Sequence, residues 1–241
     1  MNSVWRDAWW LSKFEFVKTR GLFKLIISAL VFLFTLTALS NGSVNLGTKI
    51  IFDWFFILAV TFLPYSFRSK EYQLIRMSGD FWGCSSFNFL QEQPIPEEVL
   101  LKSRFLSNSF QSIITNVILI GLLLVLPSRL NSTLSLGESI TFLFFWLLIS
   151  LMMSSLLPAS EVGDVISMTK MIVFSIIAYG SILAMTIPYY FYVRTSLIEG
   201  SIFLLRNYPV VTLVSITLLT IGSYLYCYRY AIKKMRTNDY L

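Results

Sequence analysis

Charged residues and histidine are scarce in this chain. Of its 241 residues only 13% are Asp, Glu, Lys or Arg, and none is His. A soluble domain carries about a quarter charged residues, so the deficit excludes a soluble globular protein, and the apolar content excludes a disordered chain. The absence of His removes the Ser-His-Asp triad and the H-E-x-x-H metal pair as candidate chemistry.

Cysteine clusters and phosphate-binding glycine loops are missing as well. Cys84 and Cys227 are the only thiols, and neither has the spacing of a metal site or a disulfide framework. None of the eleven glycines begins a G-x-x-x-x-G-K-[ST] loop, the motif that cradles the phosphates of ATP. We therefore expect no catalytic residue, cofactor or metal on this chain, and we do not expect it to be an enzyme.

Long apolar runs are what the chain does contain. Hydrophobic residues make up 56% of it, and its mean hydropathy is +0.69. A helix that crosses the hydrocarbon core needs about 20 apolar residues, and six runs approach that length without an internal repeat between them. The sequence thus predicts one all-α integral membrane domain over residues 1–241. The predicted spans are residues 22–39, 50–67, 109–126, 140–157, 171–192 and 208–228.

The distribution of Lys and Arg predicts the orientation of these spans. Fifteen of the nineteen basic residues flank the ends that would share one side, and the other side has only Lys49, Arg129, Arg194 and Arg206. Because basic residues gather in cytoplasmic loops, we expect both termini in the cytoplasm and a multi-pass protein of the cell (plasma or inner) membrane. The excess charge is explained by this rule, and no nucleic-acid partner is expected.

The N-terminal stretch, residues 1–20, predicts an interfacial helix. Trp5, Trp9, Leu11 or Ser12, and Phe16 fall near one face, with basic residues elsewhere, as in a helix that lies at the headgroups. The alternatives are an ordinary juxtamembrane anchor and a signal peptide cleaved near Ala38-Leu39-Ser40. The stretch is too long and aromatic for a signal n-region, which favours a retained span.

Residues 68–107 form the one long loop on the predicted cytoplasmic side. Pro96 suits a first helical position, Glu97 and Glu98 suit the first turn, and Glu98 and Lys102 are spaced to pair at i, i+4. The pattern predicts a helix whose apolar residues, Ile95, Val99 and Leu100, either contact another protein or pack on the chain's own spans.

These features together resemble the ABC-2 type permease family, the membrane subunits of type V ABC exporters. The resemblance is carried by six spans, by the K-F-E-F-V-K run from Lys13 to Lys18 in an aromatic entry helix, and by the L-x-x-x-P-I-P-x-x-x-L run from Leu90. It implies an elbow helix at the N-terminus with Trp5, Trp9 and Glu15, and a coupling helix between spans two and three that docks in an ATPase subunit. The implied coupling residues are Leu90, Pro94, Ile95, Pro96, Glu97, Glu98, Val99 and Lys102.

The resemblance also implies the partners. These are an ABC ATPase subunit that carries the ATP and Mg²⁺, a second permease copy or a paralogue, and membrane lipid. Short re-entrant helices would lie between spans five and six, where residues 189–207 stand between Pro188 and Pro209. The loop of residues 159–170, with Glu161 and Asp164, is either a second contact with the ATPase or solvated.

Two sets of polar residues fall inside predicted spans. Asp53 is one turn beyond Lys49, which predicts either a structural pair at the interface or an outer gate. A polar stripe in span three either bonds to neighbouring helices or lines a transport pathway, because lipid cannot satisfy amides. With Asp53, the possible pathway residues are Asn108, Gln111, Ser112, Thr115 and Asn116.

The favoured hypothesis is therefore the permease subunit of an ATP-driven exporter for a hydrophobic or amphipathic cargo, such as a peptide, a lipid-like molecule or an antibiotic. The alternative is a secondary transporter, or a membrane sensor or assembly protein. A secondary transporter generally shows inverted repeats and several ionisable groups at the membrane midplane, and the sequence has neither clearly.

Overall fold

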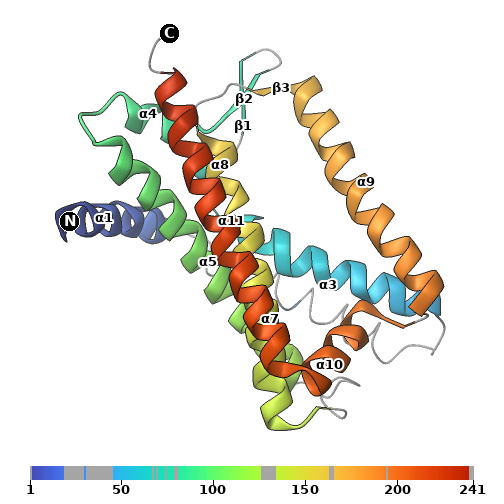
Figure 1. The fold of residues 1–241 in the computed structure, drawn as a ribbon. Helices are drawn as coiled ribbons and strands as arrows, with labels where there is room; N and C mark the ends of the chain where they lie inside the picture. The colour runs from blue at the N-terminus through green and yellow to red at the C-terminus, as the bar shows by residue number, and fades with distance from the viewer. Residues whose placement is uncertain are drawn as a thin grey trace.

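The structure is a computed structural model that describes residues 2–18, 30, 46–66, 68, 70–73, 75–78, 81–125, 134–162, 166–193 and 195–238. These residues are almost entirely helical, with one small sheet (Figure 1). In chain order the elements are α1 (Asn2–Lys18), α3 (Leu46–Ser66), the 3-10 turn η1 (Lys70–Tyr72), β1 (Ile75–Ser78), β2 (Phe81–Gly83), α4 (Ser85–Gln91), α5 (Glu97–Val125), α7 (Leu136–Ser154), α8 (Leu156–Glu161), β3 (Ile166–Ser167), α9 (Met168–Val193), α10 (Leu197–Asn207) and α11 (Pro209–Asn238).

Four stretches of this fold are long and apolar enough to cross a membrane. They are Gly47–Tyr65, Glu97–Val125, Leu136–Glu161 and Pro209–Arg236, which correspond to the predicted second, third, fourth and sixth spans. The chain is thus a helical, multi-pass membrane protein. The predicted first span lies outside the described residues except for Leu30, and the fifth falls on the helical backbone of α9, so the total of six spans stays a prediction.

The apolar core lies in two clusters that share α5. In the first, Phe56 of α3 meets Trp146 of α7 edge-on, with ring centroids 4.8 Å apart, and Ile198 of α10 joins them. In the second, Phe87 of α4 and Leu100 of α5 pack with residues of α8 and α11. One end of α5 therefore anchors the first cluster and its other end anchors the second.

The α5 helix joins two segments that the sequence analysis treated separately. The predicted coupling residues from Glu97 onward and the third span up to Val125 form one continuous helix of 29 residues, which is about 43 Å long and exceeds a hydrocarbon core of about 30 Å. Leu90 belongs instead to the short helix α4, and a turn separates α4 from α5. The predicted loop of residues 68–107 is thus largely structured, because Glu97 and Glu98 start α5 in its first turn.

A three-stranded antiparallel sheet connects two of the predicted cytoplasmic loops. Arg76 of β1 is paired with Trp82 of β2, and Trp82 is paired with Ile166 of β3. The sheet therefore brings the chain after α3 next to the chain after α8. In Figure 1 it lies at the end of the molecule that also holds the last turns of α11.

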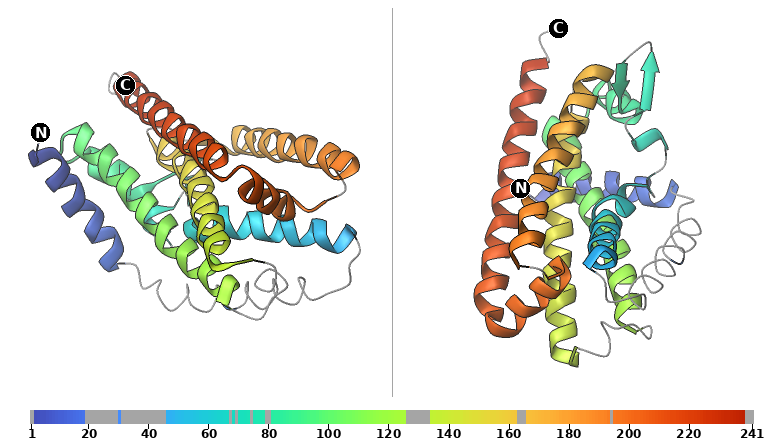
Figure 2. Two further views of the ribbon diagram at one scale, coloured as in Figure 1. Left: turned by 60° about the horizontal axis from the view of Figure 1, so that its bottom comes forward. Right: turned by 90° about the vertical axis from the view of Figure 1, so that its right-hand side faces the viewer.

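The predicted re-entrant segment, residues 189–207, differs in the structure because its first part belongs to α9. Helix α9 continues through Pro188 to Val193, and only residues 197–207 form the separate short helix α10. Ser196 starts α10 with a capping box in which its side chain and that of Glu199 bond to each other's backbone. With 11 residues, or about 16 Å, α10 is too short to span. It packs on α7 and α11, while α9 stands apart from α11 (Figures 1 and 2).

The N-terminal helix α1 packs along α5 by a face of small and polar residues. Ala8, Ser12 and Glu15 are buried, whereas Trp9 is half exposed, with its ring edge-on to Phe110 at 4.9 Å. Trp5 also stays exposed, and its ring accepts the Lys102 ammonium at 4.7 Å. Of the face predicted to lie at the headgroups, Trp5 and Trp9 are exposed and Ser12 is buried; the position of α1 at the membrane surface stays a prediction. The side chain of Phe16 is outside the described set.

Candidate functional site

Four charged side chains from four separate segments meet inside one end of the molecule. Glu15 of α1 accepts hydrogen bonds from Arg68 Nε at 2.8 Å and from Arg104 Nη1 of α5 at 3.5 Å. Glu161 of α8 accepts from both terminal nitrogens of Arg68, the Nη2 contact being 3.4 Å. We call this group the ion cluster. It ties the N-terminal helix to the ends of three elements that follow later in the chain.

The ion cluster is almost completely removed from solvent. The Arg68 side chain is 1% exposed, and those of Glu161 and Glu15 are 0% and 5% exposed. Burial alone would lower the pKa of Arg68, but the carboxylates of Glu161 and Glu15 together raise it above its usual value. Arg68 is therefore charged at any physiological pH, and the two arginines balance the two acids.

Besides Glu15, Arg104 of the ion cluster has partners that are not acids. Its Nη2 donates to Ser86 Oγ at 3.1 Å, and its guanidinium lies over the rings of Tyr72 at 4.9 Å and Phe87 at 5.8 Å. These contacts hold α4 and the turn before the sheet against α5. Its Nε is buried with no hydrogen-bond partner, so the cluster is not fully satisfied at this atom.

The corner between α4 and α5 projects from this end. The side chain of Phe89 is 60% exposed, and residues 91–94 are exposed too. On the inner side of the corner, Phe87 and Leu100 are buried in the second apolar cluster. The corner is thus anchored by one face and open on the other.

The predicted coupling residues fall on both faces of this corner. Pro94, Pro96, Glu97 and Glu98 are exposed, while Leu90, Ile95 and Lys102 are partly buried. Lys102 donates to Glu98 at 2.5 Å, so the predicted i, i+4 pair is confirmed. Val99 and Leu100 are buried. Of the two predicted alternatives, contact with another protein or packing on the chain itself, these two residues follow the second.

Two acidic residues have partners that the sequence analysis did not expect. Glu161, expected to be either solvated or in contact with an ATPase, is buried against Arg68, so both expectations are wrong for it. Glu15 was expected in the elbow helix for its resemblance to the family, and the structure adds its contacts with Arg68 and Arg104. Asp164 lies outside the described residues.

At the opposite end, Asp53 of α3 binds the start of α10. Its carboxylate accepts from the hydroxyls of Tyr190 at 2.8 Å and Ser196 at 2.5 Å, and from the backbone N–H groups of Leu197 at 2.5 Å and Ile198 at 3.4 Å. A carboxylate at a helix N-terminus also complements the helix dipole. These four donors occupy the carboxylate, which favours a structural role over a pathway role.

Two ion pairs also hold α10. Lys49 donates to Glu199 at 2.8 Å, and Arg206 donates to Glu138 of α7 at 2.6 Å. The predicted pair between Lys49 and Asp53 is therefore wrong, because each finds a partner on α10 that is distant in sequence. Helix α10 is consequently fixed to α3 and to α7 by polar contacts.

The polar stripe of the third span divides into two sets. Asn116 donates to the carbonyl of Val60 at 3.1 Å and to Ser150 Oγ at 2.6 Å, and Ser112 bonds to Ser150 at 2.5 Å. These residues connect α3, α5 and α7, as the first of the two alternatives predicts.

Asn108, Gln111 and Thr115 form the second set, one helical face at i, i+3 and i+7. Asn108 Nδ2 and Thr115 Oγ1 are buried without a hydrogen-bond partner, and Gln111 is partly buried. A buried polar atom in a native protein generally has a partner, which can be water. This face therefore keeps the second alternative, a polar pathway, open.

Comparisons of the chain with protein-family models, with curated proteins and with solved structures find no match.

Proposed function

We propose that the chain is the membrane subunit of an ATP-driven exporter and is similar in plan to the ABC-2 type permeases. The observation that supports this most directly is the α4–α5 corner, which is exposed at Phe89 and leads into a 29-residue helix. A second protein that bound the exposed residues Glu97 and Glu98 at the start of α5 would act on its transmembrane part through one unbroken helix.

The ion cluster supports the same proposal because it surrounds the first turns of α5. Arg104 lies in the early turns of α5, and its contacts reach α1, α4 and the turn at Tyr72. Movement of the corner would therefore carry α1 and the ends of α3 and α8 with it. ATP binding and hydrolysis on a partner ATPase would bias such a unit between two arrangements.

The proposed complex needs components that this chain does not supply. ATP and Mg²⁺ would bind to the ATPase subunit, and a second permease copy or a paralogue would complete the pathway. The face with Asn108, Gln111 and Thr115 is our candidate for pathway lining. Because the exposed surfaces of the spans are apolar, we propose a hydrophobic or amphipathic cargo such as a peptide, a lipid-like molecule or an antibiotic.

Photo-crosslinking from the corner tests the proposal. A photoreactive phenylalanine analogue replaces Phe89, which is 60% exposed, or as a matched control Phe203 of α10, which is 62% exposed at the opposite end. In membranes of cells that naturally make the protein, we expect Phe89 to crosslink to a subunit with a phosphate-binding loop, identified by mass spectrometry, and Phe203 not to.

The proposal fails if neither position captures an ATPase and the purified chain in liposomes moves solute on an ion gradient without ATP. That result would favour the secondary-transporter alternative.

A further inference from the structure

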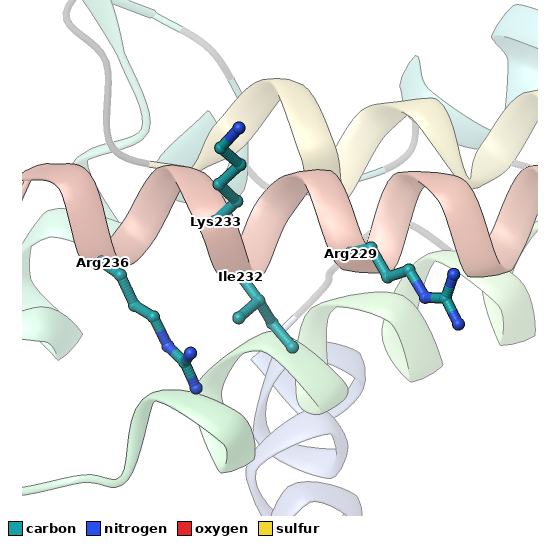
Figure 3. A pocket seen from close by; sticks show the side chains of 4 residues that line it. All are labelled: Arg229, Ile232, Lys233 and Arg236. Carbon is teal, nitrogen blue, oxygen red and sulfur yellow. The ribbon is translucent and has the colours of Figure 1, made fainter.

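A hollow beside the last turns of α11 is lined by Arg229, Ile232, Lys233 and Arg236. These residues are spaced i, i+3, i+4 and i+7, so they share one face of the helix. In Figure 3, Arg229, Ile232 and Arg236 extend toward the green ribbon of α5. Three of the four lining side chains are cationic and none is acidic.

The two arginines of this hollow differ from three other basic residues in having no acidic partner among the described residues. Arg68 and Arg104 are paired within the ion cluster, and Lys102 is paired with Glu98. Arg229 and Arg236 are exposed and have no acidic partner in the described part of the chain. Arginines that share a concave surface without a carboxylate form a site for an anion.

The depth of the hollow in the membrane follows from the length of α11. Its candidate span, Pro209–Arg236, has 28 residues, or about 42 Å of helix. A hydrocarbon core of about 30 Å takes up about 20 of them. Counted from Pro209, the core ends near Tyr228. Tyr226 and Tyr230 are exposed around this level, where aromatic residues of membrane proteins lie at the headgroups. Residues 229–236 thus lie in the headgroup layer.

We propose that this hollow binds the phosphate group of an anionic phospholipid from the adjacent leaflet. The guanidinium groups of Arg229 and Arg236 suit this ligand because guanidinium binds phosphate oxygens in bidentate geometry. Ile232 would contact the apolar part of the lipid below its phosphate. The shared chemistry of the ligand is a phosphate ester, so free inorganic phosphate is the competing source. The proposal does not depend on the exporter function.

Lipid retention tests this proposal on the full chain purified in detergent. Native mass spectrometry counts bound lipid after titration with phosphatidylglycerol, with phosphatidylcholine as the zwitterionic reference and inorganic phosphate as a separate arm. The test variant is Arg229→Gln/Arg236→Gln. The matched control is Arg6→Gln/Lys13→Gln, which removes two exposed charges from α1.

We expect phosphatidylglycerol to bind in preference to phosphatidylcholine, and the test variant to lose about thirtyfold in affinity, since each basic residue near an anionic surface contributes about a factor of five. The control variant should keep the native affinity, and melting curves verify that both variants fold. Equal losses in both variants, or no preference for phosphatidylglycerol, would overturn the proposal. Displacement of the lipid by millimolar inorganic phosphate would also overturn it, in favour of a soluble phosphate ligand.

Discussion

The ion pairs that join separate elements at the two ends of the helix bundle differ in their exposure to solvent. Helix α3 has Lys49 near its start and Arg68 just after its end, and the α7–α8 stretch has Glu138 at its start and Glu161 at its end. In the ion cluster at one end the charges are buried and interlocked, with side chains at most 5% exposed. At the other end the pairs of Lys49 with Glu199 and Arg206 with Glu138 are partly exposed.

This difference in exposure indicates which end is more rigid. A buried charge that loses its partner carries the full cost of desolvation, whereas an exposed charge returns to water. The ion cluster end therefore resists local opening, and the α10 end depends more on packing and on the bonds of Asp53.

The largest effect is expected at the ion cluster. Arg68→Gln leaves Glu15 and Glu161 buried without their main cation and should destabilise the fold by about 3–5 kcal/mol. Unfolding of the purified protein in detergent by denaturant measures this. Lys49→Gln, which removes a cation from the partly exposed pair with Glu199, should cost about 0–1 kcal/mol. Similar costs for the two variants would show that the ends do not differ.

A smaller effect is expected where α9 meets α10. A Cβ at Gly200 would lie 2.1 Å from the hydroxyl oxygen of Tyr189, so Gly200→Ala should cost about 1–3 kcal/mol through overpacking. Gly222→Ala is the control, because nothing lies within 4 Å of a Cβ there and Ala favours a helix. Tyr189→Phe should partly rescue Gly200→Ala in thermal unfolding. An unaffected Gly200→Ala variant would contradict the packing of α9 on α10.

The two sets of polar residues in α5 should differ in their contribution to the stability of the fold. Asn116→Ala breaks bonds to α3 and α7 and should cost about 1–2 kcal/mol, while Thr115→Val removes an unpaired hydroxyl and should be neutral or stabilising. Unfolding midpoints measure both. In a transport assay with an identified cargo, Thr115→Val should nonetheless lower export if its face lines the pathway. A destabilised Thr115→Val variant would instead indicate a hidden partner.

The smallest effect is expected for Arg206→Gln. Its pair with Glu138 is exposed to solvent, so the melting temperature should fall slightly at low salt and not at all at about 1 M salt, where the Debye length is about 3 Å. The melting temperature of Arg68→Gln should stay low at both salt concentrations. A salt-independent drop for Arg206→Gln would place this pair in the same class as the ion cluster.

Patterns local in sequence were predictable, and contacts between distant segments were not. Apolar run length identified the helices that contain the second, third, fourth and sixth predicted spans, and the i, i+4 rule identified the pair of Glu98 with Lys102. The same rule failed for Lys49 and Asp53, because Glu199 and the start of α10 offered better partners about 150 residues away.

The ion cluster shows why the candidate site was only partly foreseen. Its contacts join residues 53, 89 and 93 positions apart, and no periodicity connects such residues. Arg68 and Arg104 entered the sequence analysis only as indicators of orientation. The one signal was the presence of acids, Glu15 and Glu161, in segments rich in basic residues, which does not identify their partners.

The unbroken length of α5 has a geometric consequence. A rigid rod of about 43 Å that tilts by about 10° displaces its far end by about 7 Å, which is close to the diameter of a small solute. Glu97–Val125 contains no proline, a common cause of a sharp kink in a helix. An angular step at the first turn of α5 would therefore become a sideways step on the far face of the membrane.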